Sequence, residues 1–275
     1  MKRRFAVVTD STADLPDEWR DRYDIQVVPL KVLFGTETFR DRVDMTDEQF
    51  FRRLAASTTL PTTSAPSPGE FAEVYQQLAK DHDGCISIHI GAQLSATAEA
   101  ARVGASSVDG FKVHVVDSQT VSMPIAFLCR IAAECRSLDD ATAAVEQRVA
   151  KCRVLALLDT LKYLEMGGRL SRAQAMIGTM LDLKPLLLVA DREIKPVDRV
   201  RTRSRAISRM IEFFNSELPV EHMAVMHAQA PDEAERVAGE LRSEFPDRDV
   251  TVGQIGCVLG THTGPKAIGI VYLKK

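Results

Sequence analysis

The sequence predicts an α/β protein of two lobes, the first built on a mostly parallel sheet and the second an α+β lobe built on a mixed sheet. Its 275 residues exceed the usual size of one domain. Strand patterns alternate with amphipathic helical patterns in the first half, which is typical of a parallel sheet. From about residue 151, strands joined by a short turn favour a mixed sheet. We therefore expect lobes at residues 1–150 and 151–275, with a ligand in the cleft between them.

Three apolar runs in the first half predict strands of the parallel sheet, in a Rossmann-like order of strands and helices. They are Phe5–Thr9, Cys85–Ile90 and Val113–Val116, separated by helical stretches. The segment 27–44 does not fit this order, and Gly35 marks a turn within it. We expect this segment to be a small extended addition to the first lobe.

A helix over residues 68–80 has a well-marked beginning. Ser67 can cap it, and Glu70 completes a capping box three residues later. The apolar residues that follow recur at helical spacing, so one face of the helix is predicted to be buried. The capping places the beginning of this helix close to Thr63 and Ser64.

The second lobe begins with a strand at Val154–Leu158, and a pair of helices is expected around Gly167-Gly168. A hairpin follows, because two apolar strand patterns flank Asp191-Arg192-Glu193. The later elements are expected to be a helix to about 217, a strand at 222–227, a helix at 231–245 and strands at 250–257 and 267–273.

Composition narrows the classes of function. The net charge of −3 and the pI of about 6.1 give no overall attraction to nucleic acid. Five cysteines, an odd number with no C-x-x-C pair, favour a reducing compartment, so we expect a cytoplasmic protein. The apolar stretch at the start ends at Asp10, too early for a signal peptide. No apolar run approaches the roughly 18 residues of a membrane span, so stable membrane insertion is not expected.

Four groups of hydroxyl side chains stand at predicted beginnings of helices. They are Ser11-Thr12, Ser95 with Thr97, Ser118, and Thr62-Thr63-Ser64. The beginning of a helix offers unpaired N–H groups and the positive end of a dipole, which together with hydroxyls can hold a carboxylate or a phosphate without a metal. For any one of these groups, N-capping of the helix explains the hydroxyls as well as anion binding does. The four together indicate a site for an anion.

No cofactor is expected. The segment 259–266 contains a glycine, threonines and Lys266 but has Pro265 and Ala267 where a phosphate loop needs glycine and a hydroxyl residue. A proline there also removes an N–H that a phosphate would need. A G-x-G-x-x-G pattern after a strand is absent from the sequence, so a dinucleotide has no support.

A serine hydrolase is one alternative function. Ser95, His262 and an acid such as Asp117 or Asp159 could meet in space as a triad. Ser95 is not in a G-x-S-x-G motif, however, which argues against this function.

Two further groups of residues have alternative interpretations. His82, Cys85 and His89 have spacings that a metal site could use, but no fourth ligand is evident nearby. The arginines of the segment 199–205 are expected on a solvent-exposed face. One of them could instead reach an anionic ligand or an acidic partner, so a regulator that binds another small anion is the remaining alternative.

Several segments form a recognisable series along the chain: Val8–Pro16, Thr63–Ser67, Leu94–Thr97, Val115–Ser118, Leu161–Ser171 with its Gly-Gly-Arg, Val200–Thr202 and Thr261–Pro265. In this order they resemble the DegV family of bacterial fatty-acid-binding proteins. The resemblance extends from the start of the chain to the last expected strand.

The resemblance implies two α/β lobes that enclose one long-chain fatty acid, and a carrier rather than an enzyme. It implies that the carboxylate is bound by Thr63, Ser95 and His262, with Ser64 and Arg201 as second choices. Members of the family are expected to present the acid to a separate fatty acid kinase, which makes an acyl phosphate for phospholipid synthesis. The resemblance implies that Arg169, in the Gly-Gly-Arg turn, contacts this kinase.

The sequence departs from the family pattern near the expected carboxylate site. Ala65 stands where glutamine is usual, Gly91-Ala92 replaces a pair of serines, and Ala96 and Lys266 each replace glycine. These changes remove potential hydrogen bonds and backbone freedom around the expected site.

Overall fold

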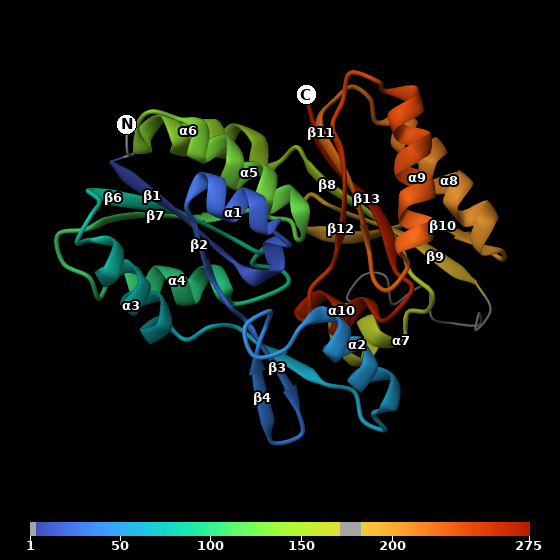
Figure 1. Cartoon of the computed structure of the whole chain (residues 1–275), viewed down its shortest axis with the longest axis horizontal. Coiled ribbons are helices and arrows are strands. Elements are labelled where there is room, and N and C mark those ends of the chain that lie inside the picture. Colours follow the sequence, from blue (N-terminus) through green and yellow to red (C-terminus); the bar gives the residue numbers. More distant parts are fainter. Residues whose placement is uncertain (1–3, 171–182) are drawn as a thin grey trace.

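The computed structural model describes residues 4–170 and 183–275, and the strands among them form three sheets (Figure 1). The first sheet is parallel, as predicted. Its order is β2 (Ile25–Val28), β1 (Phe5–Asp10), β6 (Gly84–His89) and β7 (Lys112–Asp117). Every residue of β1 and β6 is buried, as expected for parallel strands covered on both faces.

Helices cover both faces of the first sheet (Figure 1). On one face lie α3 (Pro68–Leu78) and α4 (Thr97–Ala105), and on the other lie α1 (Asp17–Tyr23), α5 (Met123–Glu134) and α6 (Leu138–Val149). The predicted capping box is present in α3, because Ser67 and Glu70 each bond the other's backbone N–H. α5 is apolar on most of its surface and contacts both β1 and β13, so it lies between the two larger sheets.

A third, small sheet consists of β4 (Glu37–Arg40), β3 (Lys31–Phe34) and β5 (Thr62–Ser64), with α2 (Asp47–Ala56) beside it. Most of the segment 27–44 therefore forms an extended unit with a turn at Gly35, while Val27 and Val28 belong to β2 of the parallel sheet. Thr63 is a strand residue paired with Val32, not a cap of the helix that follows.

The sheet of the second half is mixed, as predicted. Its order is β10 (Glu193–Val200), β9 (Lys184–Ala190), β8 (Cys152–Leu157), β13 (Ile268–Lys274), β11 (Val220–His227) and β12 (Val250–Gln254). Only β11 and β12 are parallel neighbours among these described strands. The predicted hairpin joins β9 to β10. α8 (Arg203–Ser216) and α9 (Pro231–Glu244) cover one face of this sheet, which leaves its other face toward the first lobe (Figure 1).

Two short helices lie in connections between strands of the mixed sheet. α7 (Lys162–Met166) precedes Gly167-Gly168, while the expected second helix of this pair, with Ser171, falls outside the described residues. α10 (Cys257–Thr263) replaces the end of the strand expected to reach residue 257, since β12 ends at Gln254. In the part of the chain described, no helix is long and apolar enough to cross a lipid bilayer.

Candidate ligand-binding cavity

A cavity of about 140 Å³ lies between the inner face of the mixed sheet and the first lobe, roughly ten times the space that one water molecule needs. From the first lobe it is lined by loops that follow β6 and β7, with Ile90, Leu94 and Val121. These loops stand at the carboxyl ends of parallel strands, where ligands bind in open α/β sheets. Aliphatic side chains of β8, β9, β10 and β13 line the opposite wall.

Polar side chains gather in the wall of this largely apolar cavity. Thr63, Ser95, Arg169 and His262 all line it, although they come from four separate parts of the chain. Thr63 Oγ1 lies 2.9 Å from His262 Nε2, and Ser95 Oγ lies 2.8 Å from Thr97 Oγ1. The structure thus brings together the three residues that the family resemblance implied as first choices for a carboxylate.

His262 is held as a neutral imidazole. Burial, together with the positive charge of Arg169, lowers the pKa of His262 to about 4. Its Nδ1 atom is buried and has no hydrogen-bond partner among the described residues. Because an unpaired buried N–H costs more than an unpaired lone pair, we place the proton on Nε2, where it is donated to Thr63. The hydroxyl proton of Thr63 is then available to another acceptor.

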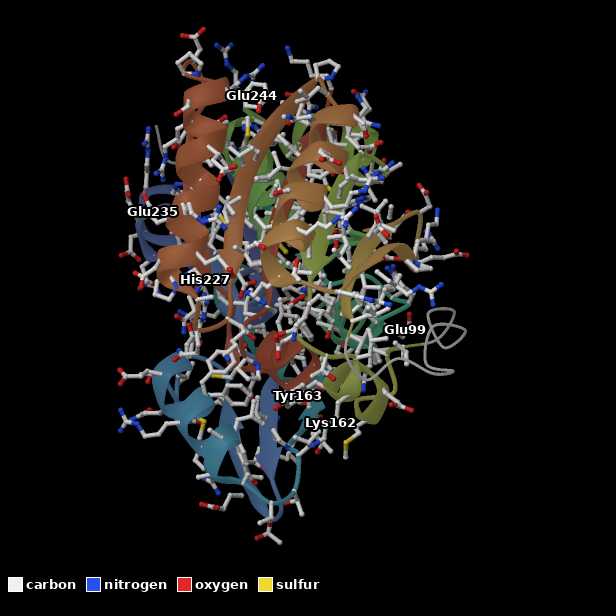
Figure 2. The ribbon with its side chains drawn as sticks, turned by 90° about the vertical axis from the view of Figure 1, so that its right-hand side faces the viewer. Glu99, Lys162, Tyr163, His227, Glu235 and Glu244 are labelled. Carbon is white, nitrogen blue, oxygen red and sulfur yellow. The ribbon has the colours of Figure 1, made fainter. Side chains whose placement is uncertain are left out.

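Gly167 and Gly168, which precede Arg169, are each explained by a different structural requirement for glycine. A Cβ atom on Gly167 would lie 2.2 Å from His262 Nδ1, so only glycine allows the imidazole to pack against this turn. Gly168 has a φ of +70°, in the left-handed region that favours glycine. Figure 2 shows α7, which carries Tyr163, beside α10, and the Tyr163 ring packs where a side chain on Gly264 would lie. This packing fixes the turn next to His262.

Arg169 lines the cavity itself, a position that the sequence did not indicate. Its Nη1 donates to the carbonyl of Gly167 at 2.6 Å and its Nε to the carbonyl of Leu94 at 3.3 Å. Both acceptors are uncharged, so these bonds orient the guanidinium without a carboxylate partner among the described residues. A half-buried positive charge in a largely apolar wall favours an anionic group there.

α10, which carries His262, is anchored at its other end by carboxylates of the first lobe. Asp14 accepts hydrogen bonds from the Gly256 N–H at 2.9 Å and the Ser122 hydroxyl at 2.6 Å. Asp41 accepts one from the Cys257 N–H at 3.0 Å. Burial raises the pKa of Asp14 to about 7, against the opposing effect of Arg42. The first lobe therefore helps to position the helix that presents His262.

Two of the residues implied by the resemblance do not reach the cavity. Ser64 alternates with Thr63 along β5, so its side chain is on the other side of the strand, exposed, and bonded to the Ala65 carbonyl at 3.1 Å. Arg201 follows the end of β10 and is exposed, in a separate surface hollow with Arg199. Neither is among the residues that line the cavity.

The departures from the family pattern are partly explained by the structure. Ala65 lines the cavity, so the usual glutamine would add a polar group there. The side chain of Gln93 occupies the space into which a side chain at Gly91 would extend. Lys266 has a φ of 61°, which explains why glycine is usual at this place.

The residues considered for a hydrolase do not form a triad in the cavity. The Ser95 hydroxyl forms a hydrogen bond with Thr97, and the His262 imidazole forms one with Thr63. Ser87, His89 and Asp10 do have the hydrogen-bond pattern of a triad, with distances of 2.7 and 3.0 Å. All three are completely buried, so a substrate cannot reach Ser87.

The residues considered as metal ligands have hydrogen bonds or burial that disfavour metal binding. His89 uses both ring nitrogens in the buried chain with Asp10 and Ser87. Burial raises the pKa of Cys85 to about 12, which disfavours the thiolate that would bind a metal. His82 follows the end of α3, and its Nδ1 is 3.3 Å from the Leu78 carbonyl.

Comparisons with known proteins agree with this architecture. A family model described as "Uncharacterised protein, DegV family" matches residues 4–275. The chain is 36% identical over 279 residues to Protein DegV of Bacillus subtilis, covering 98% of this chain and 99% of that protein. It is 38% identical over 280 residues to a DegV domain-containing protein of Streptomyces coelicolor, with the same coverage.

Two solved structures are similar over nearly the whole chain. The crystal structure of DegV from Bacillus subtilis, described as a fatty acid binding protein, has a TM-score of 0.90 at 35% identity and covers 100% of both chains. A DegV family protein from Thermus thermophilus, described by its fatty acid binding, has a TM-score of 0.91 at 31% identity. That similarity covers 99% of this chain and 100% of the other.

Proposed function

The chain belongs to the DegV family, and from this premise we propose that it binds one long-chain fatty acid in the cavity between the lobes. The observation that carries this proposal is a largely apolar cavity with Thr63, Ser95, Arg169 and His262 gathered in its wall. Similar proteins from Bacillus subtilis and Thermus thermophilus are described as binding fatty acids, which supports the same ligand class here.

The carboxylate is placed among the four polar side chains. Thr63 donates its hydroxyl proton, since its oxygen already accepts the Nε2–H of His262. Ser95 can accept from Thr97 and donate its own proton to the ligand. Arg169 supplies the positive charge that offsets the ligand's negative charge. The site thus satisfies a carboxylate with two hydroxyls and one guanidinium.

The hydrocarbon tail supplies most of the affinity. Each methylene that leaves water contributes about 0.8 kcal/mol, so a long tail contributes on the order of 10 kcal/mol before the costs of binding. The inner face of the mixed sheet offers this tail an aliphatic wall from β8, β9 and β13. Binding therefore depends on the tail, while the polar side chains set its orientation.

We infer further that the protein has no turnover of its own and presents the acid to a separate fatty acid kinase. Thr63, Ser95 and Arg169 are only partly buried, so the carboxylate end faces the more accessible part of the site. A kinase that docks there can phosphorylate the carboxylate while the tail stays buried. By this proposal Arg169 both binds the ligand and contacts the kinase, and the product is an acyl phosphate for phospholipid synthesis.

Extraction of natively purified protein, followed by mass spectrometry, tests the ligand. One fatty acid per chain is expected, and repeated recovery of empty protein that does not take up added fatty acid would overturn the proposal. Incubation of the loaded protein with a fatty acid kinase and ATP tests the presentation. Acyl phosphate should form only when this protein is present. Covalent labelling of Ser95 by a fluorophosphonate probe would instead support the hydrolase alternative.

A further inference from the structure

Side chains that face the cavity from the mixed sheet lie in two rows across neighbouring strands. Paired residues of adjacent strands lie on the same face, so the register defines each row. The middle row consists of Leu187, Ala156, Gly269 and Met226. The end row consists of Ile194, Val189, Val154 and Val271.

The middle row leaves a channel over the centre of the sheet. Gly269 has no side chain and its neighbour Ala156 has one methyl group, whereas Leu187 and Met226 on the flanking strands are large. A straight hydrocarbon chain can therefore lie along β8 and β13, between these two larger side chains. The end row has no such gap over β8, β9, β10 and β13, because its members on these four strands are all β-branched. Its next residue in register, Ala224 of β11, is fully buried and does not line the cavity.

The cavity ends at the end row. The next pair of residues on this face, Cys152 and Leu273, is buried and does not line the cavity. α5 contacts β8, β11 and β13 and belongs to the same core cluster as this pair, so it closes the sheet face beyond the end row. Val154, Val189 and Ile194 are each only 7% exposed, which fits a wall with packed residues behind it.

The polar side chains lie at the opposite end of these strands. β8 runs from Cys152 toward α7 and Arg169, and β13 begins shortly after α10 and His262. Leu158, just past the end of β8, lines the cavity at that end. It is four positions along the chain from Val154, a span of about 13 Å along the strand. With a C–C bond of about 1.5 Å, an extended chain advances about 1.3 Å per carbon, so about ten methylenes fill this span.

We propose that the end row sets an upper limit on the length of the bound acyl chain. The carboxyl carbon, about two to four methylenes beside it and the terminal methyl add to the ten methylenes of the span. The favoured ligand is therefore a straight-chain acid of about 14 to 16 carbons, and longer chains are rejected. This inference rests on the proposed function and assigns the length selection to Val154, Val189, Ile194 and Val271.

A competition experiment tests the assignment. Protein freed of lipid is loaded from an equimolar mixture of straight saturated acids of about 12 to 20 carbons, and the retained acids are quantified by mass spectrometry. Val154→Ala and Val271→Ala should each shift the profile toward longer acids, by about fourfold for each methylene newly accommodated. Ala156→Leu blocks the channel in the middle row and should shift the profile toward the shorter acids.

Ile270→Val is the matched control, because Ile270 is on the same strand as Val271 but faces α8 and α9. It should leave the profile unchanged. A profile that stays the same in Val154→Ala, Val271→Ala and Ala156→Leu, with circular dichroism confirming the fold, would refute the length selection while leaving fatty-acid binding intact. Wild-type protein that retains no acid at all would instead overturn the proposed function.

Discussion

Replacing Thr63 by valine removes the hydroxyl on which the proposed carboxylate site depends. Valine has nearly the same shape and the same branching at Cβ, so β5 and its pairing with Val32 should persist. The substitution removes the donor to the carboxylate, and it also leaves the Nε2–H of His262 without its acceptor.

The size of the effect follows from the lost contacts. A hydrogen bond to a charged group contributes about 1.5–3 kcal/mol, so the fatty acid should bind about 10- to 150-fold more weakly. The orphaned donor on His262 should cost the ligand-free protein about 1–3 kcal/mol, since it is shielded from water. For a chain of this size, each kcal/mol lowers Tm by about 2–4 °C.

Isothermal titration of lipid-free protein with a fatty acid gives the affinity, and calorimetry gives Tm. Thr62→Val is the matched control, because Thr62 is exposed on the same strand and does not line the cavity. Affinity of Thr63→Val within twofold of the wild type would refute the assignment of Thr63 to the carboxylate. Equal losses in both variants would show that the strand, not the hydroxyl, was responsible.

Three other predictions follow from the same region. Gly167→Ala places a methyl group against the His262 ring, and should weaken fatty-acid binding and lower Tm, as titration and calorimetry can measure. Arg169→Gln should weaken binding and raise the pKa of His262 above about 4, which NMR titration of the imidazole would detect; an unchanged pKa would contradict the electrostatic role of Arg169. The pKa of Asp14 is raised from 3.8 to about 7 in the folded protein. The stability that the Asp14 carboxyl group contributes is therefore fully present below pH 3.8, the pKa in the unfolded chain, and is lost as the pH rises toward about 7. Asp14→Asn should therefore gain stability relative to the wild type across this range, by up to about 4 kcal/mol in denaturant unfolding, and a pH-independent difference would contradict it.

Some features of the structure could be predicted because they depend on neighbours in the sequence. The capping box of Ser67 and Glu70 involves residues three apart, and strand patterns appear as runs of apolar residues. The parallel order of the first sheet followed from alternating strands and helices, and the mixed order of the second from its hairpin. Family resemblance added Thr63, Ser95 and His262 as a group, although nothing local connects them.

Other features depend on which segments meet in space. Thr63 and His262 are 199 residues apart and share a hydrogen bond, so no local pattern could pair them. The spacing of hydroxyls alone did not separate Thr63 from Ser64, and the family resemblance kept Ser64 as a second choice. The direction of each side chain on β5 shows that Thr63 lines the cavity and Ser64 does not.

The sequence by itself determined the two kinds of sheet and the apolar character of their strands, because backbone geometry and burial act residue by residue. Only the tertiary structure decided that Arg169 lines the cavity and that Arg201 does not. It also decided that Ala156 and Gly269 lie side by side as a channel while Val154 and Val271 close it. The physical reason is that strand register and the packing of α5 against both sheets fix these neighbours, and both are properties of the assembled chain.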